Sequence, residues 1–162
     1  MGLLFRIAGF TPFVGLLFLN AFVDLGHKII VQNTVFKVFD GQVQIILTAI
    51  VNGLILLPFV LLFTPAGFIS DRFQKPRVMR ISAMFVVGLT LLITLCYYNG
   101  WFDVAFVITF LLAIQSAFFS PAKYGYIKEV AGNELLASAN AVVQAVTIVA
   151  ILAGTFFYSV LF

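Results

Sequence analysis

The sequence has little charge. Only 9% of its 162 residues are Asp, Glu, Lys or Arg, whereas 63% are hydrophobic. A soluble domain usually carries about 25% charged residues, so a chain of this composition could not cover its surface with polar groups in water. The composition therefore indicates that the chain lies in lipid. There each backbone N–H and C=O must be bonded within the chain, which leaves helices or closed barrels.

Residues that bind metals or carry catalysis are also scarce. Cys96 is the single cysteine and His27 the single histidine, which excludes an internal disulfide, a paired-cysteine metal site and a multi-histidine site. Glycerolipid acyltransferases orient a catalytic histidine with an aspartate five positions on, and Gln32 stands at that offset from His27. No glycine-rich nucleotide loop is present. We predict that this chain has no catalytic motif, no metal and no cofactor.

Long apolar runs are what the sequence does have. A helix needs about twenty apolar residues to cross the hydrocarbon core, and barrel strands would alternate apolar with polar residues. The runs here do not alternate, so we predict an all-α membrane fold with about five transmembrane helices in one domain over residues 1–162. The predicted spans are roughly residues 10–31, 45–63, 81–98, 101–119 and 141–162. Asn99-Gly100 predicts a tight turn between the third and the fourth.

The basic residues predict how the chain is oriented. Basic residues in short loops concentrate on the cytoplasmic side. With a cytoplasmic N-terminus, only Lys37 lies outside, and the cytoplasmic side holds Arg6, Arg72, Lys75, Arg77, Arg80, Lys123 and Lys128. Basic residues scattered among membrane spans form no continuous basic face, so we expect no nucleic-acid partner. The sequence stops at Phe162 inside an apolar run, and we expect a truncation there.

The first span carries a stripe of polar residues. Asn20, Asp24, Lys28 and Gln32 recur every four positions, which places them on one helix face, and His27 lies beside them. An ionisable side chain at mid-membrane costs about 2.5–3.5 kcal/mol on insertion scales, so such groups usually face a cavity or a partner. One interpretation is a structural pair of Asp24 with Lys28. The favoured one is a cavity that binds a polar headgroup or a coupling ion, because a pair alone would not need the other polar residues.

Two smaller features leave their alternatives open. His27 is equally explained as a hydrogen-bonded interior histidine. In the second span, Gln44, Thr48 and Asn52 are again four apart. They fit either the same cavity, with Asn52 as a candidate site residue, or hydrogen bonds between helices.

The segment after the second span carries a sharper pattern. It has a glycine four positions before Asp-Arg, followed by further basic residues: Gly67, Asp71, Arg72, Lys75 and Arg77. This pattern resembles the signature between helices two and three of the major facilitator superfamily. Gln74 replaces the second glycine of that signature, and Pro76 stands where a basic residue is usual. The resemblance implies a gating motif that latches cytoplasmic helix ends; the alternative is an ordinary basic cytoplasmic loop.

Two more stretches narrow the resemblance. Asn20–Asp24, and Gln115–Gly125 with its Pro-Ala-Lys-Tyr-Gly run, resemble the lysophospholipid transporter branch of that superfamily. The alternative for the second stretch is that Pro121 and Gly125 end a helix and Lys123 marks the cytoplasmic face. The resemblance implies about five of twelve helices of a transporter in a bacterial inner membrane. Its implied partners are lysophospholipid, membrane lipid, a coupling ion and the remaining helices.

Members of the branch occur alone or fused to an acyltransferase and an acyl-carrier-protein synthetase. The implied function is movement of lysophospholipid from the outer to the inner leaflet for re-acylation. Two alternatives remain. One is a porter of another small solute, coupled to an ion through Asp24. The other is a membrane anchor for a fused enzyme, which would gain nothing from Asp24 and Lys28 inside the membrane.

Overall fold

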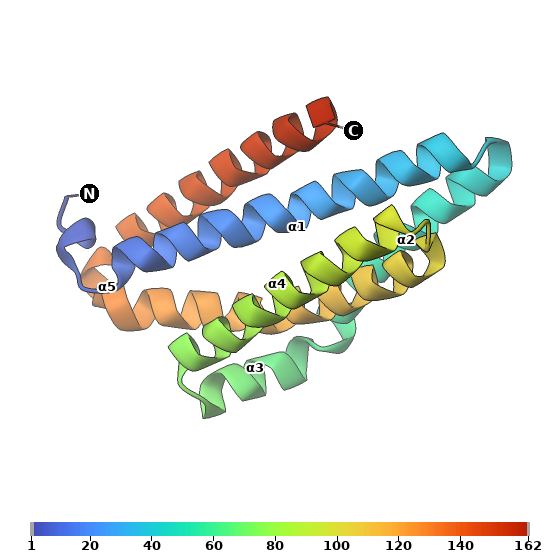
Figure 1. The fold of residues 1–162 in the computed structure, drawn as a ribbon. Coiled ribbons are helices and arrows are strands. Elements are labelled where there is room, and N and C mark those ends of the chain that lie inside the picture. Colours follow the sequence, from blue (N-terminus) through green and yellow to red (C-terminus); the bar gives the residue numbers. More distant parts are fainter. Residues whose placement is uncertain (1, 162) are drawn as a thin grey trace. The chain divides into compact units, whose positions relative to one another are not determined.

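A computed structural model describes residues 2–161, and helices make up nearly all of them (Figure 1). A short 3-10 helix, η1 (Leu4–Arg6), precedes five α-helices. These are α1 (Phe10–Val38), α2 (Gly41–Leu61), α3 (Phe63–Arg72), α4 (Lys75–Tyr98) and α5 (Phe102–Leu161). No strand occurs in the described range. The all-α prediction is confirmed.

Within residues 2–161, four helices are long and apolar enough to span a membrane, namely α1, α2, α4 and α5. The last of these contains two of the predicted spans. Gly132 interrupts it with φ 61° and ψ −174°, a backbone conformation that costs glycine little and other residues much. The chain reverses direction there, where the orange ribbon turns back into the red one in Figure 1. The predicted spans 101–119 and 141–162 thus fall on opposite sides of one glycine, with residue 162 outside the described range.

Several helices continue beyond the predicted spans. α1 runs on from Val31 to Val38, and α4 begins at Lys75 rather than near Ile81. Hydropathy marks only the part of a helix that lies in hydrocarbon, whereas the helix itself extends into the interface. The interpretation that Pro121 and Gly125 end a helix is wrong, because α5 passes through both. Membrane helices tolerate an internal proline when neighbouring groups satisfy the freed carbonyl.

The segment 67–77, expected as a loop, is mostly helical. α3 contains Gly67 through Arg72, and only Phe73 and Gln74 separate it from α4. The break before α3 falls at Leu62, whose φ and ψ of −99° and 5° leave the helical region. Pro65 explains this break, because its ring nitrogen cannot donate to the carbonyl four residues back.

The described residues form two compact units, one of residues up to 29 together with those from 123 onward, the other of residues 30–122. In the first unit, α1 packs closely on the part of α5 that follows Gly132. A Cβ added to Gly154 would lie 2.9 Å from the carbonyl oxygen of Phe22, and one added to Gly26 would overlap the Tyr158 ring. Small residues of this kind let membrane helices approach closely.

The second unit contains the end of α1 from Ile30 onward, α2, α3, α4 and the first part of α5. Its apolar cluster joins Ile93 and Cys96 of α4 to Ala105 and Ile108 of α5. The turn between these helices has Gly100 at φ 70°, which glycine adopts readily. The tight turn predicted from Asn99-Gly100 is therefore confirmed.

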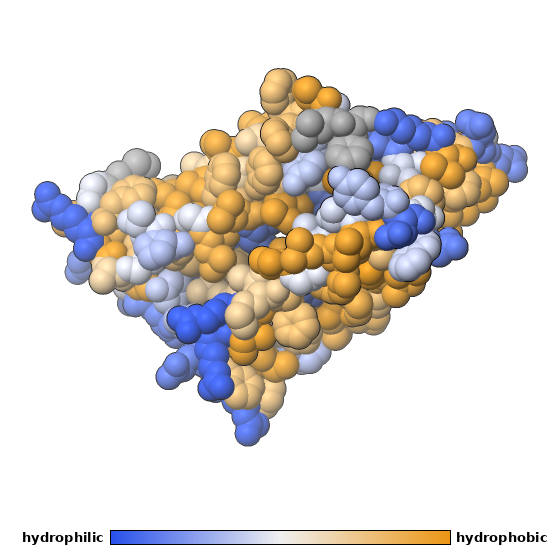
Figure 2. Space-filling model, in the orientation of Figure 1, coloured by the Kyte–Doolittle hydropathy of each residue, from blue (hydrophilic) through white to orange (hydrophobic). Residues whose placement is uncertain are grey.

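Large hydrophobic side chains are exposed on both units, and most of the face seen in Figure 2 is hydrophobic. Val60 and Phe156, for example, are 76% and 74% exposed. Soluble monomers rarely expose extended apolar patches of this kind, which mark membrane or protein contacts. With four helices of spanning length, this surface indicates a multi-pass membrane protein.

Candidate functional site

Asp24 of α1 lies away from the face by which this helix packs on α5. Phe22 and Gly26 meet the end of α5. Asp24 lies two residues from each of them, which is about 200° around a helix of 3.6 residues per turn. Its side chain is exposed, while Lys28 one turn further on is half-buried. The packing of α5 on α1 therefore leaves the Asp24 face of the helix open.

Two neighbours of Asp24 are more enclosed. His27 is buried, with 5% of its surface exposed. The Oδ1 atom of Asn20 is also buried and accepts no hydrogen bond from the part of the chain that the structure describes. Burying a polar atom without a partner usually costs about 1–3 kcal/mol. This oxygen can accept a hydrogen bond from a ligand on the same helix face as Asp24.

Gln32 and Asn52 connect α1 to α2 within the second unit. The Nε2 of Gln32 donates to the Oδ1 of Asn52 at 3.4 Å, and the Nδ2 of Asn52 donates to the carbonyl of Thr48 at 2.9 Å. Gln44 donates from Nε2 to the carbonyl of Phe36 at 3.4 Å. The contacts of Gln32 with Asn52 and of Gln44 with Phe36 fit the interpretation of the second polar series as hydrogen bonds between helices, whereas Thr48 donates within α2 to the carbonyl of Gln44. A cavity role for Gln32 and Asn52 stays a prediction.

The gating pattern lies around the two-residue connection between α3 and α4. Phe73 and Gln74 have φ values of −108° and −58°, which any residue adopts. The connection therefore needs no glycine, which explains how Gln74 can replace the second glycine of the signature. The Gln74 carbonyl accepts the N–H of Arg77 at 2.9 Å and that of Val78 at 3.1 Å. Pro76 falls in the first turn of α4, where no N–H is required.

Two charges of this pattern are exposed at the end of α3. Asp71 and Arg72 are the last two residues of α3, and both are exposed. The guanidinium carbon of Arg72 lies 5.9 Å from the centre of the Phe68 ring, and the cation is favourably placed at a helix C-terminus. Asp71 stands at the wrong end of its own helix for the dipole. If Asp71 stabilises a helix N-terminus, that N-terminus therefore belongs to another helix.

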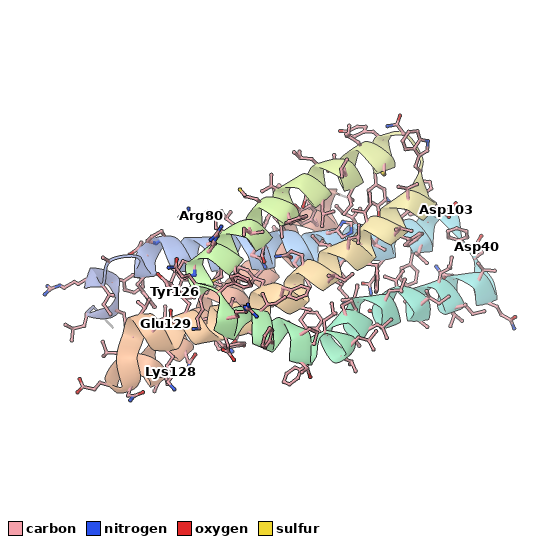
Figure 3. All side chains as sticks on the ribbon, turned by 90° about the horizontal axis from the view of Figure 1, so that it is seen from below. Asp40, Arg80, Asp103, Tyr126, Lys128 and Glu129 are labelled. Carbon is pink, nitrogen blue, oxygen red and sulfur yellow. The ribbon has the colours of Figure 1, made fainter. Side chains whose placement is uncertain are left out.

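Residues predicted to lie on different sides of the membrane fall at opposite ends of the second unit, and which end is cytoplasmic stays a prediction. Figure 3 shows Asp40 and Asp103 at one end of this unit and Arg80 toward the other. The expected outer loops contain the two aspartates, and the expected cytoplasmic side contains the arginine.

Three relatives show what the chain is similar to. Lysophospholipid transporter LplT of Photorhabdus laumondii is 37% identical over 101 residues, that of Escherichia fergusonii 40% over 99, and that of Serratia proteamaculans 36% over 103. The chain resembles lysophospholipid transporters. Each match covers 59–63% of this chain and 23% of the relative, so the match spans less than a quarter of these transporters. No family model and no solved structure matches the chain.

The relatives confirm the predicted resemblance to lysophospholipid transporters, and their names are those of transporters rather than enzymes. Sequence reasoning missed the close contacts at Gly26 and Gly154. It also missed a cavity in the second unit beside Gln115. A glutamine within an apolar run was the available signal for the cavity.

Proposed function

We propose that the chain forms part of a lysophospholipid transporter of a bacterial inner membrane, which moves its substrate from the outer to the inner leaflet. The 36–40% identity to lysophospholipid transporters carries this proposal. The open, charged face of α1 supports it, because an intramembrane carboxylate usually marks a substrate or ion pathway.

The polar stripe of α1 supplies groups that a phospholipid headgroup needs. Asp24 can pair with a headgroup ammonium, and Lys28 with its phosphate. The buried Oδ1 of Asn20 can accept a further hydrogen bond, while the acyl chain stays in apolar surroundings. Binding alone moves nothing. Transport requires two conformations that bind the substrate with different affinities, which in major facilitator folds arise as two halves rock about a shared site.

Uptake by the complete transporter tests this function. In reconstituted vesicles, spin-labelled lysophosphatidylethanolamine should move between leaflets at a rate well above that of protein-free vesicles. Diacyl phosphatidylethanolamine with the same label is the matched control. It should move no faster in these vesicles than in protein-free vesicles. Movement of neither lipid, or equal movement of both, would contradict the assignment.

The orientation can be tested by labelling. We expect cysteines placed at Asn99 or Gly100 to react with an impermeant thiol reagent from outside the cell. Cysteines at Gln74 or Glu134 should react only after the membrane is opened. Cys96 is buried, and its replacement by alanine removes any background labelling of the native thiol. Labelling with the opposite sidedness would overturn the cytoplasmic N-terminus.

The gating pattern predicts an effect on transport rather than on binding. In the complete transporter, Asp71→Asn should slow uptake by about tenfold and change the substrate Kd less than twofold, because a latch sets the balance between conformations. Asp103→Asn, which removes an exposed carboxylate from the other end of the second unit, is the matched control. Unchanged uptake by the Asp71→Asn protein at normal expression would show that the pattern is an ordinary basic connection without a gating role.

A further inference from the structure

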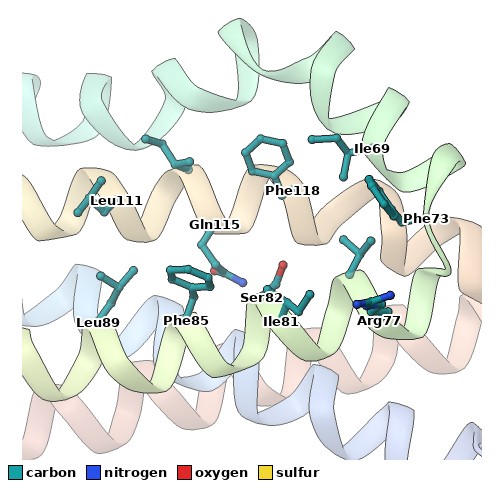
Figure 4. A pocket seen from close by; sticks show the side chains of 12 residues that line it. Ile69, Phe73, Arg77, Ile81, Ser82, Phe85, Leu89, Leu111, Gln115 and Phe118 are labelled. Carbon is teal, nitrogen blue, oxygen red and sulfur yellow. The ribbon is translucent and has the colours of Figure 1, made fainter.

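The second unit contains a cavity of about 580 Å³ that the α1 stripe does not use. Its walls come from the end of α3, from α4 and from the first part of α5 (Figure 4), and Phe85 in its wall is 63% exposed. Ligand sites are typically about 300–1,000 Å³ in volume and mostly apolar, with a few polar groups that fix orientation. This cavity has that composition.

Three polar side chains line the cavity: Arg77, Ser82 and Gln115. Arg77 stands at one end with an exposed cation, and Leu89 and Leu111 close the other end (Figure 4). Ser82 lies between them on α4. The helix rises about 7.5 Å from Arg77 to Ser82 and about 10.5 Å from Ser82 to Leu89. The cavity thus runs from a cation through a polar middle to an apolar end.

Gln115 marks the middle of the cavity as a binding position. Only 7% of its surface is exposed, and it points from α5 toward Ser82 (Figure 4). Its Oε1 accepts a hydrogen bond from Ser116 at 3.3 Å, but its Nε2 is buried without a partner in the described residues. A buried N–H that lacks an acceptor is costly. A ligand with an acceptor oxygen at this depth would satisfy it.

We propose that this cavity binds an anionic phospholipid of the membrane. The phosphate pairs with Arg77, an ester carbonyl accepts a hydrogen bond from Gln115 Nε2, and one acyl chain extends between Leu89 and Leu111. Clusters of basic residues at the cytoplasmic face attract anionic lipids, which supplies the charge complementarity. The proposal does not depend on what the protein transports.

Native mass spectrometry of the complete protein tests this site. Phosphatidylglycerol and phosphatidylcholine with the same acyl chains are offered in equal amounts, and the retained lipids are counted. We expect more phosphatidylglycerol than phosphatidylcholine on the wild type. Arg77→Gln should lower the retained phosphatidylglycerol by about fivefold, the effect of losing an exposed ion pair of about 1 kcal/mol. Arg80→Gln, exposed on the same helix outside the cavity, should not.

A second pair of variants tests the acyl chain. Leu111→Trp fills the apolar end of the cavity and should lower the retained phosphatidylglycerol by a similar factor. Val107→Trp, one turn earlier on α5 and outside the cavity, should leave it unchanged. Three results would each overturn the proposal. They are an equal loss of phosphatidylglycerol in Arg77→Gln and Arg80→Gln, wild-type retention of phosphatidylglycerol in Leu111→Trp, and equal binding of both lipids to the wild type.

Discussion

Replacement of Asp24 by asparagine should reduce lysophospholipid uptake by the complete transporter at least tenfold, close to background. Asp24 lies on the open face of α1, opposite the residues that pack on α5. Its loss should therefore leave the helix packing and the membrane insertion intact. It removes the carboxylate that we assign to the headgroup ammonium or to a coupling ion, and it leaves Lys28 without the compensating charge. Uptake of spin-labelled lysophosphatidylethanolamine measures the effect, with expression determined in parallel.

The double variant separates function from structure. If Asp24 and Lys28 only neutralise each other, Asp24→Asn with Lys28→Gln should restore uptake, because neither charge is then left alone. If the carboxylate is the working group, the double variant should stay inactive. The four proteins form a double-mutant cycle on uptake rate. Uptake near the wild-type rate in the double variant would end the assignment of Asp24 as a site residue.

Replacement of Gly154 by leucine should prevent normal packing of the first unit. Even a Cβ at this position would lie 2.9 Å from the carbonyl oxygen of Phe22, which is backbone and cannot rotate away as a side chain can. The helices would have to separate. This would also part the Phe22 ring from Phe157 and Tyr158, whose ring centres lie 5.9 and 5.6 Å away. Overpacking of this kind costs typically 1–3 kcal/mol, and more where backbone must move.

The measurement is thermal stability in detergent together with the yield of monodisperse protein. We expect Gly154→Leu to lower Tm by roughly 5 °C or more, or to abolish the monodisperse fraction. Gly88→Leu is the matched control, because a Cβ at Gly88 in α4 meets nothing within 4 Å. A Gly154→Leu protein as stable as the Gly88→Leu protein would contradict the close approach of α1 and α5.

The sequence predicted the parts of this fold that follow from hydropathy. Unbroken apolar runs located the membrane spans, and Asn99-Gly100 located a turn whose positive φ favours glycine. Helix ends were predicted less well, because α1 continues through Gln32 to Val38 with polar residues that hydropathy reads as loop. A proline and a glycine also looked like a helix end at 121–125. Whether they end a helix depends on neighbouring helices that satisfy the backbone, which local sequence does not contain.

The candidate site was likewise predicted only in part. A four-residue spacing was enough to place Asn20, Asp24 and Lys28 on one helix face, because that geometry is internal to a helix. The direction in which this face points depends on what packs on the opposite face of α1. That required the contacts of Gly26 in α1 with Tyr158 and of Gly154 in α5 with Phe22. Gln115 within an apolar run was a signal for the cavity, but the cavity itself was not predictable, since it depends on how the consecutive helices α3, α4 and α5 pack against one another.

The joint within α5 constrains how the first unit can move. Gly132 is the only residue between two helical stretches, without a loop on either side. Any change in the angle between residues 123–131 and residues 133–161 must therefore come from the two torsions of this one glycine or from unwinding a helix end. Such a joint allows the two helical stretches to rotate about Gly132 but not to slide apart. It gives the last helical stretch of the chain a single hinge, and it couples the position of Tyr158 against Gly26 to one backbone conformation.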